Sequence, residues 1–139
     1  MPEQLNTTLV NEQGEVQRFI EIAEEFCRRN NFSEKDINSV CLIFDELLTN
    51  TINYGYSDDR KHEINILIET DGSYFSAELI DDAVPFNPLD QPEAETDIPV
   101  EEREIGGLGI HIVKKIADEL SYERLADRNI LRIKKNIKQ

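Results

Sequence analysis

The chain has 139 residues, of which 29 are acidic and 15 basic, and its formal net charge is −14. This length suits a single domain built around one hydrophobic core. The negative charge argues against direct contact with nucleic acid, whose phosphates are normally met by basic surfaces. No apolar run reaches the roughly 18 residues that span a bilayer, and the first residues lack the features of a signal peptide. We therefore expect a cytoplasmic protein that makes no membrane contact.

The two cysteines show no sign of a metal site. Cys27 and Cys41 both fall in apolar helical patterns, and neither has a partner at a metal-ligand spacing. We expect buried free thiols in a reducing compartment.

The first half of the chain predicts a strand followed by two helices. Residues 5–10 are typical of a short strand, and residues 11–14 of a turn. From residue 15 to residue 29, apolar side chains recur at the spacing of an amphipathic helix. Ser33, with Asp36 three positions later, signals the start of a second helix, which we expect to stop near Gly55.

The second half predicts two hairpins that flank a loop and a third helix. Residues 62–70 and 74–80 alternate apolar and polar side chains around a turn at Asp71-Gly72, and residues 120–125 and 130–137 form a closing hairpin around a loop from Ala126 to Asn129. Between residues 81 and 105 no apolar period remains, and such a segment is often a lid. This order predicts an α/β (α+β) fold, a two-layer sandwich with helices on one face of a mixed, mostly antiparallel sheet.

The third helix is preceded by the most informative motif of the chain, Gly106-Gly107-Leu108-Gly109. Glycines at a helix start let backbone N–H groups approach a ligand closely, and the helix end adds a partial positive charge. A phosphate group fits such a site. The alternative is a tight turn without a ligand.

The second helix carries polar residues at helical spacing. Glu46, Asn50 and Asn53 are separated by four and three positions, so they fall on one narrow face. A carboxylate and an amide oxygen one turn apart can hold a magnesium ion or activate a hydroxyl beside a phosphate. The alternative is a solvated face opposite the apolar stripe.

An acid pair, Asp81-Asp82, stands where an apolar strand ends. A carboxylate above an apolar floor can accept a hydrogen bond from the exocyclic amine of adenine, whereas guanine presents an oxygen there. The alternative is an ordinary acidic turn.

These motifs, in this order, resemble the ATP-binding domain of the GHKL superfamily, and most closely its anti-sigma-factor serine/threonine kinases. The resemblance extends over nearly the whole chain, so it implies one ATP-binding domain over residues 1–139 with a lid at residues 87–105. It implies that Glu46 is the general base, that Asn50 ligates Mg²⁺ and that Asp81, rather than Asp82, recognises adenine. The remaining nucleotide contacts that it implies are Asn53, Ala83, Phe86, Arg103, Gly106, Gly107, Leu108 and Gly109.

The chain departs from the family pattern at three positions. Ala83 stands where the family usually has glycine, and Tyr54 where the serine kinases often have histidine. Many members have a threonine near the adenine in the final strand, and we expect Arg132, with Ile133 beside it, at that place. We expect the changes at residues 83 and 132 to leave phosphate binding intact and to affect nucleotide affinity, and Tyr54 makes the helix face an imperfect copy of the family pattern.

The resemblance implies a kinase that binds MgATP, captures a sigma factor and phosphorylates a small antagonist protein, thereby regulating transcription; it also suggests a homodimer. One alternative is a nucleotide-binding interaction module that transfers no phosphate. Another is a detached histidine-kinase catalytic domain, which is disfavoured because no dimerisation helix with a phospho-accepting histidine is evident. We expect His62 to be a surface strand residue and His111 an ordinary residue of the third helix.

Overall fold

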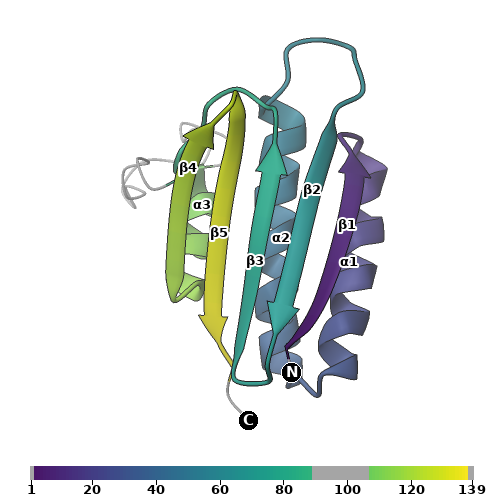
Figure 1. Ribbon diagram of the computed structural model, residues 1–139, viewed down its shortest axis with the longest axis vertical. Helices are drawn as coiled ribbons and strands as arrows, with labels where there is room; N and C mark the ends of the chain where they lie inside the picture. The colour runs from purple at the N-terminus through teal and green to yellow at the C-terminus, as the bar shows by residue number, and fades with distance from the viewer. Residues whose placement is uncertain (1, 89–106, 138–139) are drawn as a thin grey trace.

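The computed structural model describes residues 2–88 and 107–137, in which helices cover one face of a five-stranded sheet (Figure 1). The other face of the sheet carries no helix of the described chain. In chain order the elements are β1 (Glu3–Val10), α1 (Gln13–Arg29), α2 (Glu34–Tyr54), β2 (Glu63–Thr70), β3 (Tyr74–Asp81), α3 (Gly107–Ile116), β4 (Glu119–Leu125) and β5 (Arg128–Asn136).

The strands lie in the order β1-β2-β3-β5-β4, and each neighbouring pair is antiparallel. The predicted two-layer fold is therefore confirmed. Because β5 pairs with β3, the last strand crosses back into the middle of the sheet and β4 forms an edge. This crossover brings the end of β3 beside the start of β5, where Asp81 and Asn129 are register partners.

The start and the end of α2 lie where the sequence predicted them. The Ser33 hydroxyl oxygen accepts a hydrogen bond from the Asp36 backbone N–H at 3.1 Å, which satisfies one of the free donors of the first turn. At the other end, the Gly55 N–H donates to the carbonyl oxygen of Thr51 at 2.9 Å. Helix α1 begins at Gln13, two residues before the predicted start.

The core lies between the helices and the sheet and is rich in phenylalanine. Phe19 and Phe44 pack edge to face, with ring centroids 4.8 Å apart. Phe75 of β3 meets Phe26, Phe32 and Phe44 in similar contacts. Such pairs add to the stabilisation that burial of the rings provides.

Both cysteines are free, as the sequence predicted. Cys27 is fully buried in the core and Cys41 is half-buried. Burial raises the pKa of the Cys27 thiol to about 12, so this thiol stays protonated and unreactive near neutral pH.

The closing hairpin has a shorter loop than the sequence predicted. Only Ala126 and Asp127 form the loop, with φ values of 52° and 62°, so Arg128 and Asn129 belong to β5. Two-residue loops with positive φ at both positions match the twist of antiparallel strands. Asn129 therefore lies in the sheet, not in a turn.

None of the helices in the described part of the chain combines the length and the apolar character needed to cross a bilayer.

Candidate functional site

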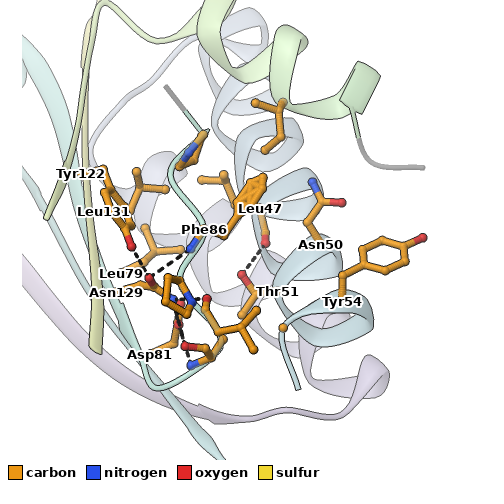
Figure 2. Close-up of a pocket in the computed structure, with 16 residues that line it drawn as sticks. Leu47, Asn50, Thr51, Tyr54, Leu79, Asp81, Phe86, Tyr122, Asn129 and Leu131 are labelled. Atoms are coloured by element: carbon orange, nitrogen blue, oxygen red, sulfur yellow. Dashed lines mark hydrogen bonds between the residues drawn. The ribbon is translucent and has the colours of Figure 1, made fainter. Parts of the chain in front are cut away.

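A cavity of about 260 Å³ opens between α2, the loop after β3, the first turn of α3 and the β4–β5 hairpin (Figure 2). Its floor is apolar, and its polar groups come from α2, the end of β3 and the start of β5. The lining residues are Leu47, Asn50, Thr51, Tyr54, Gly55, Leu79, Asp81, Ala83, Val84, Pro85, Phe86, Pro88, Ile110, Tyr122, Asn129 and Leu131.

Helix α2 presents Leu47, Asn50, Thr51 and Tyr54 to the cavity. These positions follow the three-and-four spacing of one helix face. The Asn50 side-chain nitrogen Nδ2 is buried and has no hydrogen-bond partner among the described residues. A buried amide nitrogen without a partner is unfavourable, so Asn50 is a candidate for contact with a ligand in the cavity.

Of the three residues that the sequence analysis placed on one face of α2, only one lines the cavity. Asn50 lines it, whereas Asn53 is exposed and does not. Glu46 is half-buried, one turn before Asn50, and lies outside the lining. Burial, followed by repulsion from Asp45, raises the pKa of the Glu46 carboxyl, which makes its carboxylate a better proton acceptor.

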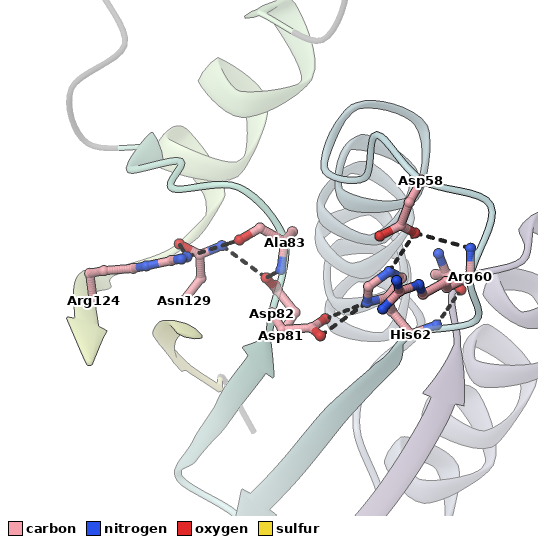
Figure 3. Close-up of polar contacts among 9 residues, drawn as sticks. Asp58, Arg60, His62, Asp81, Asp82, Ala83, Arg124 and Asn129 are labelled. Carbon is pink, nitrogen blue, oxygen red and sulfur yellow. Dashed lines mark hydrogen bonds and ion pairs between the residues drawn. The ribbon is translucent and has the colours of Figure 1, made fainter. Parts of the chain in front are cut away.

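Asp81 is buried at the end of β3, on the floor of the cavity. Its Oδ1 accepts hydrogen bonds from Asn129 Nδ2 at 2.9 Å and from the Ala83 N–H at 3.0 Å (Figure 3). Within the described chain the other oxygen, Oδ2, accepts none, so it is available to a ligand donor. Burial raises the pKa of Asp81, and the hydrogen bond from Asn129 opposes that rise.

Asn129 is the site residue that the sequence analysis missed. Its Nδ2 also donates to the carbonyl oxygens of Val84 at 3.0 Å and of Ala83 at 3.3 Å. Its Oδ1 accepts from the Tyr122 hydroxyl at 2.5 Å and from Arg124 Nη1 at 3.1 Å. One buried amide therefore joins β3, the following loop and β4. The sequence did contain a signal for this role. Asn129 is an amide at a position that alternates with the apolar residues Leu131 and Ile133, and this spacing places it on the buried face of a strand.

The alanine that replaces the family glycine is accommodated by a neighbouring glycine. Ala83 is buried, and a Cβ added to Gly55 would lie 2.7 Å from the Ala83 Cβ and 2.5 Å from the Thr51 carbonyl oxygen. The Val84 N–H also donates to the Gly55 carbonyl oxygen at 2.9 Å. Gly55 thus allows the loop after β3 to approach the end of α2 closely.

The expectation that Arg132 lies near the adenine position is wrong. Arg132 is exposed on the uncovered face of the sheet, where its guanidinium pairs with Glu78 at 2.9 Å and with Glu123 at 3.3 Å. Side chains alternate between the two faces of a strand, so the β5 residues that face the cavity are Asn129 and Leu131.

Helix α3 brings the glycine motif to the cavity. It begins at Gly107, and Ile110 of its first turn is buried and lines the cavity. Gly107, Leu108 and Gly109 thus open the helix at the edge of the site, where backbone N–H groups are free of helical partners. Phe86, from the loop after β3, also lines the cavity. Gly106, Arg103 and the lid from residue 89 onward lie outside the described residues.

A magnesium ion fits this donor set. Nowhere in the described chain do three Asp, Glu, His or Cys side chains gather closely enough to hold a metal. Mg²⁺ needs no such cluster when substrate phosphates and water supply most of its oxygen ligands. The Asn50 amide carries a neutral oxygen of the kind that Mg²⁺ accepts, and its nitrogen Nδ2 has no hydrogen-bond partner among the described residues that would fix the amide in place.

Comparisons with known proteins agree with this geometry. The family model of the histidine kinase-like ATPase domain matches residues 9–135. Among solved structures, the chain is similar to the RsbU and RsbW domains of Rv1364c from Mycobacterium tuberculosis, with a TM-score of 0.69 and 13% identity. That match covers 97% of this chain and 32% of the solved one, and at this identity it supports the fold. A comparison with curated proteins finds no match. Since the family match extends over most of its length, the chain belongs to the histidine kinase-like ATPase domain family.

Proposed function

We propose that this chain is an ATP-binding serine/threonine protein kinase that acts as an anti-sigma regulator. The observation that carries the proposal is the arrangement of one cavity, with a buried carboxylate at one end and an unpaired amide and a glycine-led helix start at the other. This arrangement suits a ligand with a base at one end and phosphates at the other.

The end of the cavity formed by Asp81 is suited to adenine. Asp81 Oδ1 is occupied by Asn129 and Ala83, which leaves Oδ2 to accept from the exocyclic amine. Leu79 and Leu131 supply an apolar floor for the ring. Guanine would place a carbonyl oxygen against the carboxylate, so we expect ATP to bind more tightly than GTP.

The other end of the cavity is suited to phosphates and to their transfer. The N–H groups at the start of α3, around Gly107 and Gly109, would hold the phosphate oxygens, and Asn50 would hold Mg²⁺. When bound, the metal offsets the negative charge that builds up on the phosphates. Glu46, with its raised pKa, would accept the proton of the attacking hydroxyl.

The partners in this proposal are a sigma factor and a small antagonist protein that carries the accepting serine or threonine. The similarity of the fold to the RsbW domain of Rv1364c supports a regulatory partner of this kind. A homodimer belongs to the same proposal, and so does a role in the cytoplasm.

The pocket is tested by calorimetric titration of ATP and GTP, each with and without magnesium. We expect binding that prefers ATP and strengthens with the metal. Equal binding of the two nucleotides, or none, contradicts the proposal. The exposed Asn53→Ala variant is the control, because it changes the same helix away from the cavity.

The second candidate is a module that binds ATP and a partner without transfer. It is favoured by the position of Glu46 outside the cavity lining. Glu46→Gln separates the two candidates in a single-turnover phosphorylation assay with candidate antagonists. A kinase loses transfer by about 10²-fold or more and keeps ATP binding. If the unchanged chain transfers no phosphate while binding ATP, the module is the better description.

A further inference from the structure

Both nitrogens of the His62 imidazole face carboxylates (Figure 3). Nδ1 lies 3.0 Å from Asp82 Oδ2 and 3.2 Å from Oδ1, and Nε2 lies 2.8 Å from Asp58 Oδ1. The side chain is 16% exposed, so His62 is not the open surface residue that the sequence predicted. It is the last residue of the loop between α2 and β2, and its ring lies between Asp58 of that loop and Asp82, the first residue after β3.

This geometry determines the protonation state of the ring. A neutral imidazole has one N–H, and an ionised carboxylate can only accept. Two hydrogen bonds to two carboxylates therefore require an N–H on both nitrogens, which is the imidazolium form. In agreement, the hydrogen bonds to Asp82 and then to Asp58 raise the pKa of His62, against a smaller effect of burial.

The ring is held in place by its surroundings. It stacks on Tyr56, with centroids 4.5 Å apart and planes 23° from parallel. The His62 N–H donates to Asn11 Oδ1 at 2.8 Å, and the Asn11 N–H donates to the His62 carbonyl oxygen at 3.0 Å. Asp58 Oδ1 also accepts from the Arg60 N–H at 3.0 Å. The nearby Lys61 ammonium points to another acid, Glu12, at 3.8 Å.

We propose that His62 is a positioning residue for the nucleotide site: its imidazolium holds Asp82 against the loop after α2, so that only Asp81 of the acid pair serves the cavity. This inference rests on the function proposed above. The loop after β3 is then anchored on both sides, by Asn129 through Asp81 and by His62 through Asp82.

The reason lies in the charge of the pair. Two carboxylates at the Asp81 end of the cavity would repel the phosphates of a nucleotide. Burial raises the pKa of Asp81 and of the Tyr56 hydroxyl, and the charge of Asp82 makes a smaller contribution in the same direction to both. The His62 imidazolium offsets the negative charge of the Asp82 carboxylate, which lies beside it. Because the pKa of His62 is raised in the folded chain, the clamp is complete at pH values below the ordinary histidine pKa of about 6.5, as long as the carboxylates are ionised, and it is lost as pH rises through the raised pKa.

The first test follows the His62 ring by NMR titration of the whole chain without nucleotide. We expect a pKa above the ordinary value of about 6.5, and a lower pKa in both Asp82→Asn and Asp58→Asn. Asp59→Asn is the matched control, because it removes an exposed charge next to Asp58 in sequence that does not hydrogen-bond to the His62 ring. A ring pKa at or below the ordinary value, or equal effects of all three variants, overturns the clamp.

The second test is a double-mutant cycle on ATP affinity, measured by calorimetry with magnesium. His62→Gln should weaken ATP binding by about fivefold at a pH below the ring pKa. In an Asp82→Asn background the same change should have almost no effect, because no charge remains to be held away. A merely structural role, such as stacking on Tyr56, predicts the same loss in both backgrounds and would refute the positioning role. If the unchanged chain binds no ATP, the proposed function fails together with the positioning role, whereas a raised ring pKa would still establish the imidazolium clamp.

Discussion

The two ends of the cavity are here called the base end, formed by Asp81, and the phosphate end, formed by Asn50 and the start of α3. They differ in how many of their polar groups are hydrogen-bonded in the chain without a ligand. At the base end, Asp81 Oδ1 accepts a hydrogen bond from Asn129, whose amide ties three elements together, and Asp81 Oδ2 alone is left without a described donor. At the phosphate end, the Asn50 amide has a buried atom without a partner among the described residues, and the Glu46 carboxylate is partly desolvated. The first end therefore has more hydrogen bonds within the fold, and in the proposed function the second gains its partners when the ligand binds.

This difference has a physical reason. A nucleotide base is recognised by hydrogen bonds of defined direction. The protein group that accepts them must therefore be held in one orientation by hydrogen bonds of its own. Phosphates and a hydrated cation bring their own charges and oxygens, and the protein groups that meet them gain partners only on binding. Buried polar groups without partners are unfavourable to the fold, so they are kept where the ligand will complete them.

The largest effect on stability is expected from Asn129→Ala at the base end. The change leaves the Asp81 carboxylate and the Tyr122 hydroxyl without their shared partner, so we expect a loss of about 2–4 kcal/mol in the free energy of unfolding. Urea denaturation measures it. Asn136→Ala at the exposed end of the same strand is the control. A loss under about 1 kcal/mol would mean that this amide does not organise the base end.

The contrasting change is Asn50→Ala at the phosphate end. Since Asn50 Nδ2 has no partner, the unliganded chain should keep its stability or gain up to about 1 kcal/mol. Affinity for MgATP should fall by about 100-fold, because the metal loses a ligand. Denaturation and calorimetry on one preparation test both statements. Equal destabilisation by Asn50→Ala and Asn129→Ala would remove the distinction between the two ends.

A smaller effect, a gain in stability, is expected in the two-residue turn that precedes β5. Ala126 has a φ of 52°, a conformation that glycine adopts without the strain of a side chain. We expect Ala126→Gly to stabilise the chain by about 1 kcal/mol and to leave ATP affinity unchanged. Thermal unfolding is the measurement, and a loss of stability would show that the turn is not strained.

The smallest effect concerns the pH dependence contributed by Glu46. Its pKa in the folded chain is raised, so protonation favours the folded state and this carboxyl is unfavourable at pH values above that pKa. We expect Glu46→Gln without nucleotide to be slightly more stable than the unchanged chain near pH 7, and the gap to close as pH falls toward the ordinary value of about 4.3. A gap that is constant with pH would assign the effect to packing.

Local patterns predicted most of the elements correctly. The Ser33 cap and Gly55 bound α2 as expected, and the alternation of apolar residues located β2 and β3 within about two residues. The closing loop was predicted two residues too long, because Ala126 and Asp127 carry no glycine signal for a tight turn. That error placed Asn129 in a loop and hid its role.

The site was predicted only in part, because local patterns do not show how the elements meet one another. Asn50, Asp81, Ala83 and Phe86 do line the cavity. Asn53 does not, because helical spacing defines which residues share a face but not the angle at which that face meets its neighbours. Arg132 was misplaced because the face of a strand residue depends on the strand register.

By itself the sequence determined the order and type of the elements and some of the residues that line the cavity, since periodicity, capping and glycine geometry act over a few neighbouring positions. Only the tertiary structure decided which of those residues meet. The contacts of Asp81 with Asn129 and of His62 with Asp82 join positions 48 and 20 residues apart, and they exist because β5 crosses back beside β3 and β2 lies on its other side. No local pattern encodes such pairings, because they follow from how the sheet is ordered.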